Sequence, residues 1–370
     1  MPIQNADTLK SGGRKRVIYQ SEALFAGKAG VATTVDHNIS RVQSINYSFS
    51  VPRTDVNQYG TLGQIERIIT EVPTVNLDFT YHMNGVVNET RLLGLGAAGL
   101  SNGFLADINN PESNYYEMDF KVGLCPEGTD YNSGTGHSEN SIVIPKGFLS
   151  SYSWTGAVGD VPSATVNAES TEMKVAPFGV SVPTFNLDVP VVLRPGNVQF
   201  NHKPVGSNPN TNDYNLPVLG FDVLHVQSFT VSIDIPRESI SRLGDKFEFA
   251  RVITFPMQAT MSLEAIISTQ AASNLEEIVG QAGGTSPDPG YNIDIACKRP
   301  VTTAGSTKGI NLRFKNAKIE GHSISSSIGS NKSVTLDYAV QVDGGGLSYD
   351  AAAAGFFMQV DDAAAQPPSG

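Results

Sequence analysis

The stretch VQSINYSFSVPRTDVNQYGTLGQIERIIT, from Val42 to Thr70, occurs a second time as VQSFTVSIDIPRESISRLGDKFEFARVIT, from Val226 to Thr254. The two copies stay in register without a gap, because 226 − 42 and 254 − 70 are both 184. The positions that hold the same residue in both copies are Val42, Gln43, Ser44, Ser48, Pro52, Arg53, Gly60, Arg67, Ile69 and Thr70. A repeat of this length predicts a duplicated domain.

Apolar and polar side chains alternate at the start of each copy, with the period of two that is typical of a strand with one buried face. The predicted buried faces consist of Ile45, Tyr47, Phe49 and Val51 in the first copy and of Phe229, Val231, Ile233 and Ile235 in the second. Pro52 and Pro236 then end these strands, because proline cannot donate to the ladder. A polar segment follows in each copy, and a second strand begins near Val75 and near Ala259.

The match between the copies continues downstream, where it predicts a short helix, a third strand and a closing hairpin. The matching blocks are Asn88–Gly94 with Asn274–Gly280, Tyr116–Phe120 with Tyr291–Ile295, and Ser153–Val166 with Ser323–Leu336. In the second of these blocks, Asp119 falls opposite Asp294. The predicted fold class is therefore all-β with short helices, arranged as two tandem antiparallel β-sandwich domains.

The repeat and the composition of the intervening segments predict the domain boundaries. A linker separates the two copies where the match is lost and prolines recur, and the C-terminal end carries alanine runs and a final Pro-Pro-Ser-Gly. The predicted parts are an N-terminal arm at 1–15, a first β-domain at 16–170, a linker at 171–189, a second β-domain at 190–343 and a flexible tail at 344–370.

The composition excludes several classes of protein. The net charge of −11 would repel nucleic acid, so a sequence-reading nucleic-acid protein is not expected. The cysteines, Cys125 and Cys297, do not occupy equivalent repeat positions and are predicted to be free thiols. No apolar run is long enough to cross a bilayer, and the N-terminus lacks the apolar core of a signal peptide, so we expect neither membrane insertion nor ordinary secretion.

Two motifs of catalytic proteins occur, but neither has the required context. GLGAAG, from Gly94 to Gly99, follows a short helix instead of lying between a strand and a helix. GLSNG, around Ser101, lacks the strand-to-helix turn of a nucleophile elbow. The histidines show no pair at metal-ligand spacing: His37, His82, His137, His202, His225 and His322. We therefore expect no enzymatic activity and no catalytic, cofactor-binding or metal-binding residue.

Two arginines enclose the polar segment in each copy. Arg53 and Arg237 follow the strand-ending proline, and Arg67 and Arg251 begin the next strand. A guanidinium group can hold the base of its own loop to carboxylates or carbonyl groups, or it can reach a partner subunit. Both interpretations stay open, and the four arginines are candidate contacts with a partner subunit.

The pattern VQSINYSFSVPR, then IERIITEVPTVNLDFTYHMNG and LLGLG, resembles the tail tube (major tail) proteins of long-tailed bacteriophages. The resemblance covers the repeat unit, and so most of the chain. It implies an antiparallel β-sandwich with a short helix and a long loop that contacts the next ring. Six such domains close a ring, with their sheets joined edge to edge as an inner β-barrel. The implied stacking loops are Arg53–Glu66 and Arg237–Ala250.

Two such domains in one chain imply that three chains close a pseudo-hexameric ring. The resemblance then implies a virion protein of the phage tail, assembled in the host cytoplasm, whose acidic lumen lets viral DNA pass without specific binding. Its other partners would be the tail terminator, hub and tape measure proteins, and no cofactor is implied. The alternatives are a hub or baseplate protein that caps the tube, another β-sandwich virion structural protein, or an enzyme.

Overall fold

The structure, a computed structural model, describes residues 22–31, 37–83, 87–94, 108, 113, 116–124, 140–177, 198–204, 224–244, 248, 250–267, 290–298, 309–326, 331–342 and 354–361. Of the described structure, 70% is strand and 4% is helix, and the strands form large antiparallel sheets. The predicted all-β fold class is therefore confirmed.

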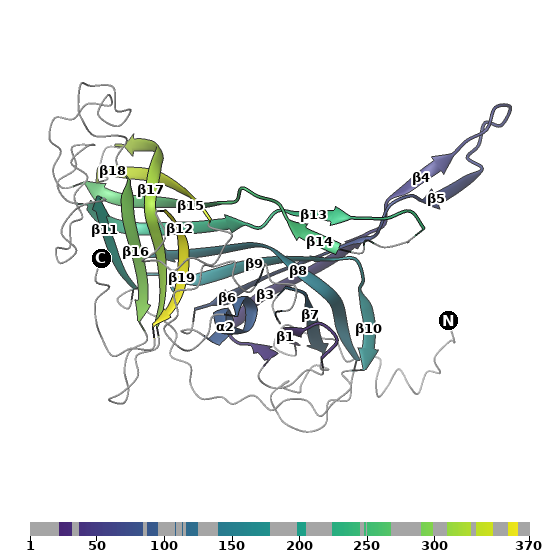
Figure 1. Ribbon diagram of the computed structural model, residues 1–370, viewed down its shortest axis with the longest axis horizontal. Helices are drawn as coiled ribbons and strands as arrows, with labels where there is room; N and C mark the ends of the chain where they lie inside the picture. Colours follow the sequence, from purple (N-terminus) through teal and green to yellow (C-terminus); the bar gives the residue numbers. More distant parts are fainter. Residues whose placement is uncertain are drawn as a thin grey trace.

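Strands far apart in the sequence join into one large sheet (Figure 1). The elements of the first half are β1 (Glu22–Lys28), β2 (Asn38–Ile39), β3 (Val42–Ser50), β4 (Arg53–Val56), β5 (Glu66–Ile69), β6 (Thr74–His82), α2 (Val87–Leu93), β7 (Met118–Leu124), β8 (Asn140–Ala157), β9 (Ser163–Ser170) and β10 (Lys174–Pro177). Those of the second half are β11 (Val198–Pro204), β12 (Leu224–Asp234), β13 (Arg237–Ile240), β14 (Ala250–Ile253), β15 (Gln258–Ile267), β16 (Tyr291–Lys298), β17 (Gly309–Ser325), β18 (Ser333–Gln341) and β19 (Gly355–Asp361).

The strand pairings of the first half recur in the second. In the first half the order is β1, β7, β8, β9, β6, β3, with β10 also paired to β8. In the second half it is β11, β16, β17, β18, β15, β12, with β19 also paired to β17. Even the register shifts correspond, since one follows Val42 in β3 and another follows Val226 in β12.

Each half bends at one residue of its longest strand. In β8 this residue is Lys146, with φ 52°, and in β17 it is Asn316, with φ 56°. The Lys146 N–H donates to Oδ1 of Asp119 over 3.1 Å, and the Asn316 N–H donates to Oδ1 of Asn292 over 3.0 Å. The bend divides each long strand between two layers of the fold. The first part pairs with β7 or β16, and the second part pairs with β9 or β18.

These hydrogen bonds correct the predicted alignment of the third strand. The structural counterpart of Asp119 is Asn292, not Asp294, because each accepts from the bend of its own long strand. Asp294 instead accepts a hydrogen bond from Arg313 on β17 over 3.0 Å. The sequence alignment was two residues out of register, and a shift of two leaves every side chain on its original face. The alternation of apolar residues therefore could not reveal the error.

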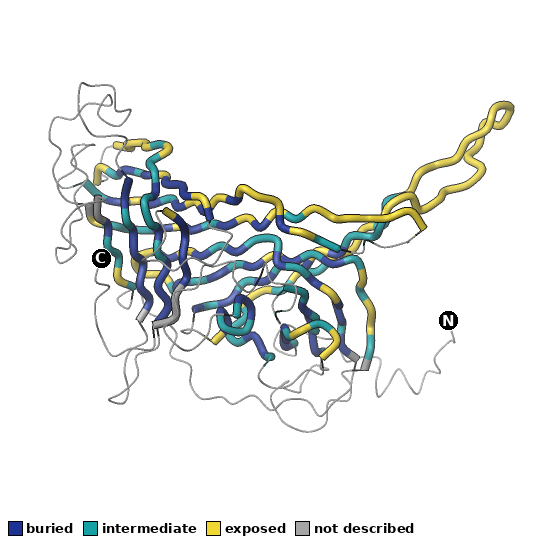
Figure 2. Tube along the Cα trace, viewed as in Figure 1, coloured by how far each residue is buried: buried dark blue, intermediate teal, exposed yellow. Residues whose placement is uncertain are grey.

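The core lies between the two layers of each half (Figure 2). Phe79 on β6 and Phe120 on β7 approach to 6.2 Å between ring centroids. In the second half, Nε2 of His202 on β11 lies 3.0 Å from the Tyr338 hydroxyl on β18. These contacts connect the layers and make each half sandwich-like.

The short helix α2 rests on the first half. It corresponds to the short helix predicted over Asn88–Gly94 and begins one residue earlier, at Val87. The Asn88 side chain exchanges two hydrogen bonds with the Ser40 backbone, at 2.9 and 2.8 Å. The helix ends at Leu93, and Gly94 follows it with φ 72°.

Two predicted irregular segments contain strands. β10 lies within the predicted linker, and β19 lies within the predicted flexible tail. Both pair with the first part of their long strand, and β19 buries Phe356, Phe357 and Met358. The prediction of a flexible tail is therefore wrong for Gly355–Asp361, because an unpaired side of β17 is available to this short apolar segment. The N-terminal arm, Ser101, Cys125, His137 and the expected second helix lie outside the described residues.

The two polar segments of the sequence repeat form hairpins outside the main sheet. β4 pairs with β5, and β13 pairs with β14. Their turns contain Gly60 and Gly244, both with positive φ, which glycine adopts without steric cost. The β4–β5 hairpin projects far beyond the rest of the chain (Figure 1).

Candidate assembly surfaces

Among the described strands, one pair joins the two halves of the chain. β12 of the second half pairs with the second part of β8 from Ser228 to Asp234. Val231 lies opposite Trp154, and Ile233 lies opposite Tyr152. The Trp154 ring also packs edge-on against Phe229 at 5.2 Å. We call this β8–β12 contact the junction.

Each strand of the junction has a counterpart at an edge of the sheet. β3 is the counterpart of β12, and within the described residues it pairs only with β6. The second part of β17 is the counterpart of the second part of β8, and within the described residues it pairs only with β18. The sheet therefore ends on both sides in strands whose counterparts are joined inside the chain.

The apolar side chains of these edges are exposed, whereas their counterparts at the junction are buried. Phe49 on β3 is 63% exposed, and its counterpart Ile233 is fully buried. Ile324 on β17 is 40% exposed, and its counterpart Trp154 is fully buried. The unpaired backbone N–H and C=O groups of an edge strand are a template for pairing with another chain, and such pairing would also cover exposed apolar side chains.

The alternation in the sequence predicted a buried face on β3, and the single chain does not bury it completely. Ile45, Tyr47 and Val51 are half-buried, and Phe49 is exposed. The same face of β12 is buried because β8 lies beside it. Within the described residues, no strand takes that place beside β3.

The sheet that runs from β3 through β6, β9, β8, β12, β15 and β18 to β17 has a polar face opposite the core. The side chains of this face include Asn46 and Ser48 on β3, Asn76, Asp78 and Thr80 on β6, Ser163, Thr165 and Asn167 on β9, Ser151, Ser153 and Thr155 on β8, Thr230 and Ser232 on β12, Thr260, Ser262 and Glu264 on β15, Thr335 and Asp337 on β18, and Ser323 and Ser325 on β17. None of these is Lys or Arg, but Lys318 of β17 lies on the same face, because it pairs with Ala339 and Ala339 pairs with Thr260.

Cross-strand hydrogen bonds hold the side chains of this polar face. They join Asn46 to Asp78 (2.7 Å), Thr80 to Thr165 (3.2 Å), Asn167 to Ser151 (2.7 Å) and Ser262 to Asp337 (2.7 Å). Side chains that bond to one another present fewer unsatisfied donors to a passing ligand. The polar face is therefore neutral to acidic and well suited to contact an anion without retaining it.

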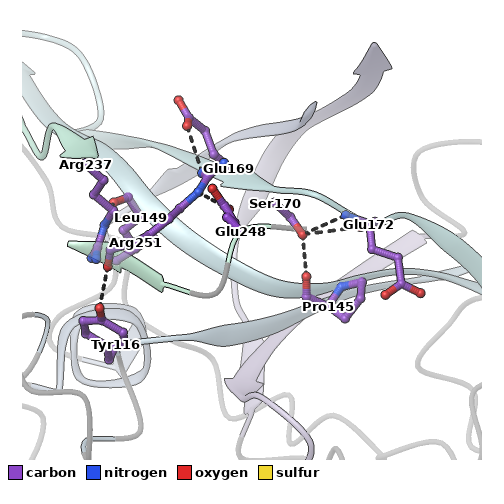
Figure 3. Close-up of polar contacts among 9 residues, drawn as sticks. All are labelled: Tyr116, Pro145, Leu149, Glu169, Ser170, Glu172, Arg237, Glu248 and Arg251. Atoms are coloured by element: carbon purple, nitrogen blue, oxygen red, sulfur yellow. Dashed lines mark hydrogen bonds and ion pairs between the residues drawn. The ribbon is translucent and has the colours of Figure 1, made fainter. Parts of the chain in front are cut away.

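Arg237 lies against the first half of the chain (Figure 3). Its Nε donates to the Leu149 carbonyl over 3.3 Å, and its guanidinium group lies 5.4 Å from the Tyr116 ring centroid and 5.1 Å from that of Phe148. Neither Nη atom has a hydrogen-bond partner among the described residues. Burial lowers the pKa of Arg237 to about 10. The aromatic rings therefore provide much of its stabilisation.

Arg251 lies beside Arg237 in the same cluster. Its Nη1 forms an ion pair with Glu169 on β9 over 3.2 Å, and its Nε donates to Glu248. The Tyr116 hydroxyl donates to the Arg251 carbonyl (Figure 3). Since Tyr116 and Glu169 belong to the first half, the two arginines hold the β13–β14 hairpin to the other half of the same chain.

Arg53 and Arg67, the counterparts of these arginines, are both exposed. Arg67 forms an ion pair with Asp55 of its own hairpin over 3.1 Å. The structure therefore assigns Arg237 and Arg251 contacts within the chain. Contact between rings through any of the four arginines stays a prediction, and the exposure of Arg53 and Arg67 makes them the accessible pair.

A buried carboxyl group lies between α2 and the sheet. The Tyr81 hydroxyl on β6 donates to Oε1 of Glu89 over 2.9 Å. Burial raises the pKa of Glu89 to about 7, although the hydrogen bond from Tyr81 partly offsets this effect. The nearby Cys297 of β16 is a buried free thiol, as predicted, and burial raises its pKa.

We expect Glu89→Gln to remove a pH dependence of stability. The folded chain retains a proton on Glu89 up to about pH 7, whereas the unfolded chain releases it near the ordinary pKa of 4.5. The contribution of Glu89 to the free energy of unfolding is therefore complete below pH 4.5. It decreases by about 3 kcal/mol as the pH rises from 4.5 through 7. Urea unfolding at pH 5 and pH 8 measures the effect. Glu66→Gln, at an exposed carboxyl group, is the control and should keep the pH dependence of the wild type; identical pH profiles for wild type and Glu89→Gln would contradict the assignment.

No metal or membrane site emerges from the described residues. They contain no group of three or more His, Cys, Asp and Glu side chains placed to hold a metal ion. They also contain no helix that is both long and apolar enough to span a membrane. Burial of His202 lowers its pKa to about 3, so this imidazole stays neutral in the core.

The fold and these surfaces define the class as an all-β protein with open, partly apolar sheet edges. No protein-family model matches the chain, and no curated protein matches it. The geometry of the edges and the polar face therefore provides the basis for assigning a function.

Proposed function

We propose that the chain is a structural subunit that closes with two further copies into a ring, and that such rings stack into a tube of the phage-tail type. The observation that carries this proposal is the junction. At the junction, the second part of the long strand β8 pairs with β12, the strand that precedes a hairpin. Among the described strands, the counterparts of these two strands have no pairing partner on their outer side, at the ends of the sheet.

The junction also provides a register for the contact between copies. At the junction Val231 lies opposite Trp154. The repeat counterpart of Val231 is Tyr47, and that of Trp154 is Ile324. The same geometry would therefore place Tyr47 of one copy opposite Ile324 of the next. It likewise places Phe49 opposite His322, because Ile233 lies opposite Tyr152. This pairing would cover the exposed Phe49 and Ile324 in the same step and leave neither edge unpaired.

A ring built in this way is a closed β-barrel. Each chain contributes a continuous run of eight strands from β3 to β17, and closure requires each end to meet the opposite end of a neighbour. The contact is heterologous, so it forms either a closed ring or an open helix according to the rotation between copies. The apolar core of each chain would lie on the outer side of the barrel wall, and the polar face would line the lumen.

The chemistry of the polar face supports passage of a polyanion. It presents hydroxyl, amide and carboxylate groups, and the chain as a whole has a net charge of −11. Nucleic acid binds proteins mainly through Lys and Arg contacts to phosphate. A lumen with few of these groups, Lys318 among the described ones, would let DNA slide, which is the role expected of a tail tube.

The mass and shape of the purified protein test the proposal. Light scattering should give a species of three 39.3-kDa chains or a multiple of it, and electron microscopy should show hollow tubes. A mass of one chain under all conditions would refute it. Single rings that never extend would favour the alternative of a hub protein that caps a tube.

A further inference from the structure

We propose that Glu22 of one copy and His322 of the next form an ion pair across the contact between neighbouring chains of a ring. The proposal rests on the proposed function, and it identifies the side chains by which the two ends of the sheet recognise each other. At the junction inside the chain, the corresponding positions hold a valine and a tyrosine.

Glu22 lies at the end of β1 that reaches the β3 edge. It is half-buried and occupies the same face of β1 as Leu24 and Ala26, which belong to the core. Burial raises the pKa of Tyr47 on β3, and the charge of Glu22 raises it further, so these two side chains are neighbours. Within the described residues, no cation forms an ion pair with Glu22.

This carboxyl group is placed at a cost. Burial raises the pKa of Glu22, because the charged form loses contact with water. A carboxylate that is partly withdrawn from water is stabilised when a cation lies beside it. The β3 edge is open, so a neighbouring copy can supply that cation.

The junction shows which side chain of a neighbour reaches the end of β1. Burial is the main reason that the pKa of Tyr152 on β8 is raised, and the charge of a Cys297 thiolate would raise it further. Tyr152 therefore lies near Cys297, at the end of β16. Val198 of β11 pairs with Cys297 and lies on the same core-facing side. The side chain at the position of Tyr152 thus approaches the ends of two strands from the other half.

The same geometry applied to the contact between copies brings an acid to a base. The counterpart of Tyr152 is His322, and the ends of β7 and β1 take the places of those of β16 and β11. Glu22 pairs with Leu124 there, in the position of Val198. His322 of one copy therefore lies beside Leu124 and Glu22 of the next.

The surroundings of His322 leave Glu22 as its ionic partner. In its own chain His322 is exposed and lies opposite Leu336 of β18. The other ionisable groups near it are Glu320 on the same strand and the Tyr47 hydroxyl of the next copy. Glu320 is exposed, so water and salt screen its charge. Glu22 lies on the half-buried, core-facing side, where a charge pair is screened less.

The pair also selects how two edges meet. Contact between two β3 edges would place a Glu22 carboxylate on both sides, and contact between two β17 edges would do the same with His322. Like charges that face each other across an interface suppress such pairings. The β3–β17 contact is therefore favoured, and this contact is the heterologous one that can close a ring.

The test exchanges the charges across the contact. In His322→Glu two carboxylates would face each other, and the protein concentration at which rings form, measured by light scattering at pH 6, should rise at least about tenfold. Adding Glu22→Lys restores opposite charges and should return this concentration to within about threefold of the wild type. His225→Glu is the matched control, because His225 is exposed on β12, inside the sheet. This control should form rings like the wild type.

The pH dependence of ring formation is a second readout. Lowering the pH from 8 to 6 should favour wild-type rings, because the pair requires a protonated imidazole. His322→Gln should lose this pH dependence and keep the far-UV circular dichroism spectrum of the wild type.

Three results would overturn the ion pair: wild-type ring formation by His322→Glu, no recovery in the double variant, or the same pH dependence in His322→Gln as in the wild type. In each case the wild-type rings themselves would still stand. A wild-type chain that forms no ring would instead refute the proposed function, and the ion pair with it.

Discussion

Replacing Tyr47 and Phe49 together with aspartate is expected to abolish assembly and leave a folded single chain. In the proposed ring both side chains become covered by β17 of the next copy, as Val231 and Ile233 are covered by β8. Burying an aromatic side chain contributes about 2 kcal/mol, and an uncompensated buried carboxylate adds a larger penalty. Over the contacts of a closed ring, these losses exceed what the remaining pairing could offset.

The solution mass measured by light scattering checks this expectation, and far-UV circular dichroism checks that the β structure persists. Val175→Asp provides the control, because Val175 is 67% exposed on β10 and takes no part in either sheet edge. It should assemble like the wild type. If the double aspartate variant kept the assembled mass, β3 could not be the edge that joins neighbouring copies.

Replacing Arg237 with glutamate should destabilise the chain by about 3–5 kcal/mol, the range found when one member of a buried charge cluster is removed. The carboxylate would lie against the negative faces of the Tyr116 and Phe148 rings and near the Leu149 carbonyl. Arg53→Glu alters the repeat counterpart, which is exposed, and should change stability by no more than about 0.5 kcal/mol.

Urea unfolding of the two variants side by side measures the difference. Equal stabilities would show that the cluster around Arg237 does not hold the β13–β14 hairpin to the first half. The surroundings of Arg237 and Arg53 differ, and the sequence repeat does not extend to those surroundings.

The repeat and its alternation predicted the strands correctly because both depend on local sequence. The period of two in Val42–Ser50 and in Leu224–Asp234 requires strands, and the prolines after them end the pairing. The hairpin from Ser153 to Val166 was predicted for the same reason. The four arginines were also found as a set, because their spacing within the repeat is preserved.

The register of β16 and the existence of the last strand, β19, could not be predicted from the sequence. A shift of two residues in β16 keeps every apolar side chain on its face, so the true alignment became visible only in the structure, for example in the hydrogen bond from Asn316 to Asn292. The alanine runs and the final Pro-Pro-Ser-Gly predict a flexible tail, but β19 lies within this segment. Its burial depends on the side of β17 that is open to pairing, which is a property of the assembled sheet.

By itself the sequence determined the all-β class, the repeated unit and the apolar face of β3, since side-chain period and chain-breaking residues act locally. The tertiary structure decided which copies of these features are covered. β12 and β3 have nearly the same pattern, yet Ile233 is buried and Phe49 is exposed. The physical reason is that burial depends on the neighbouring strand, and β12 has β8 beside it whereas β3 stands at the edge of the sheet.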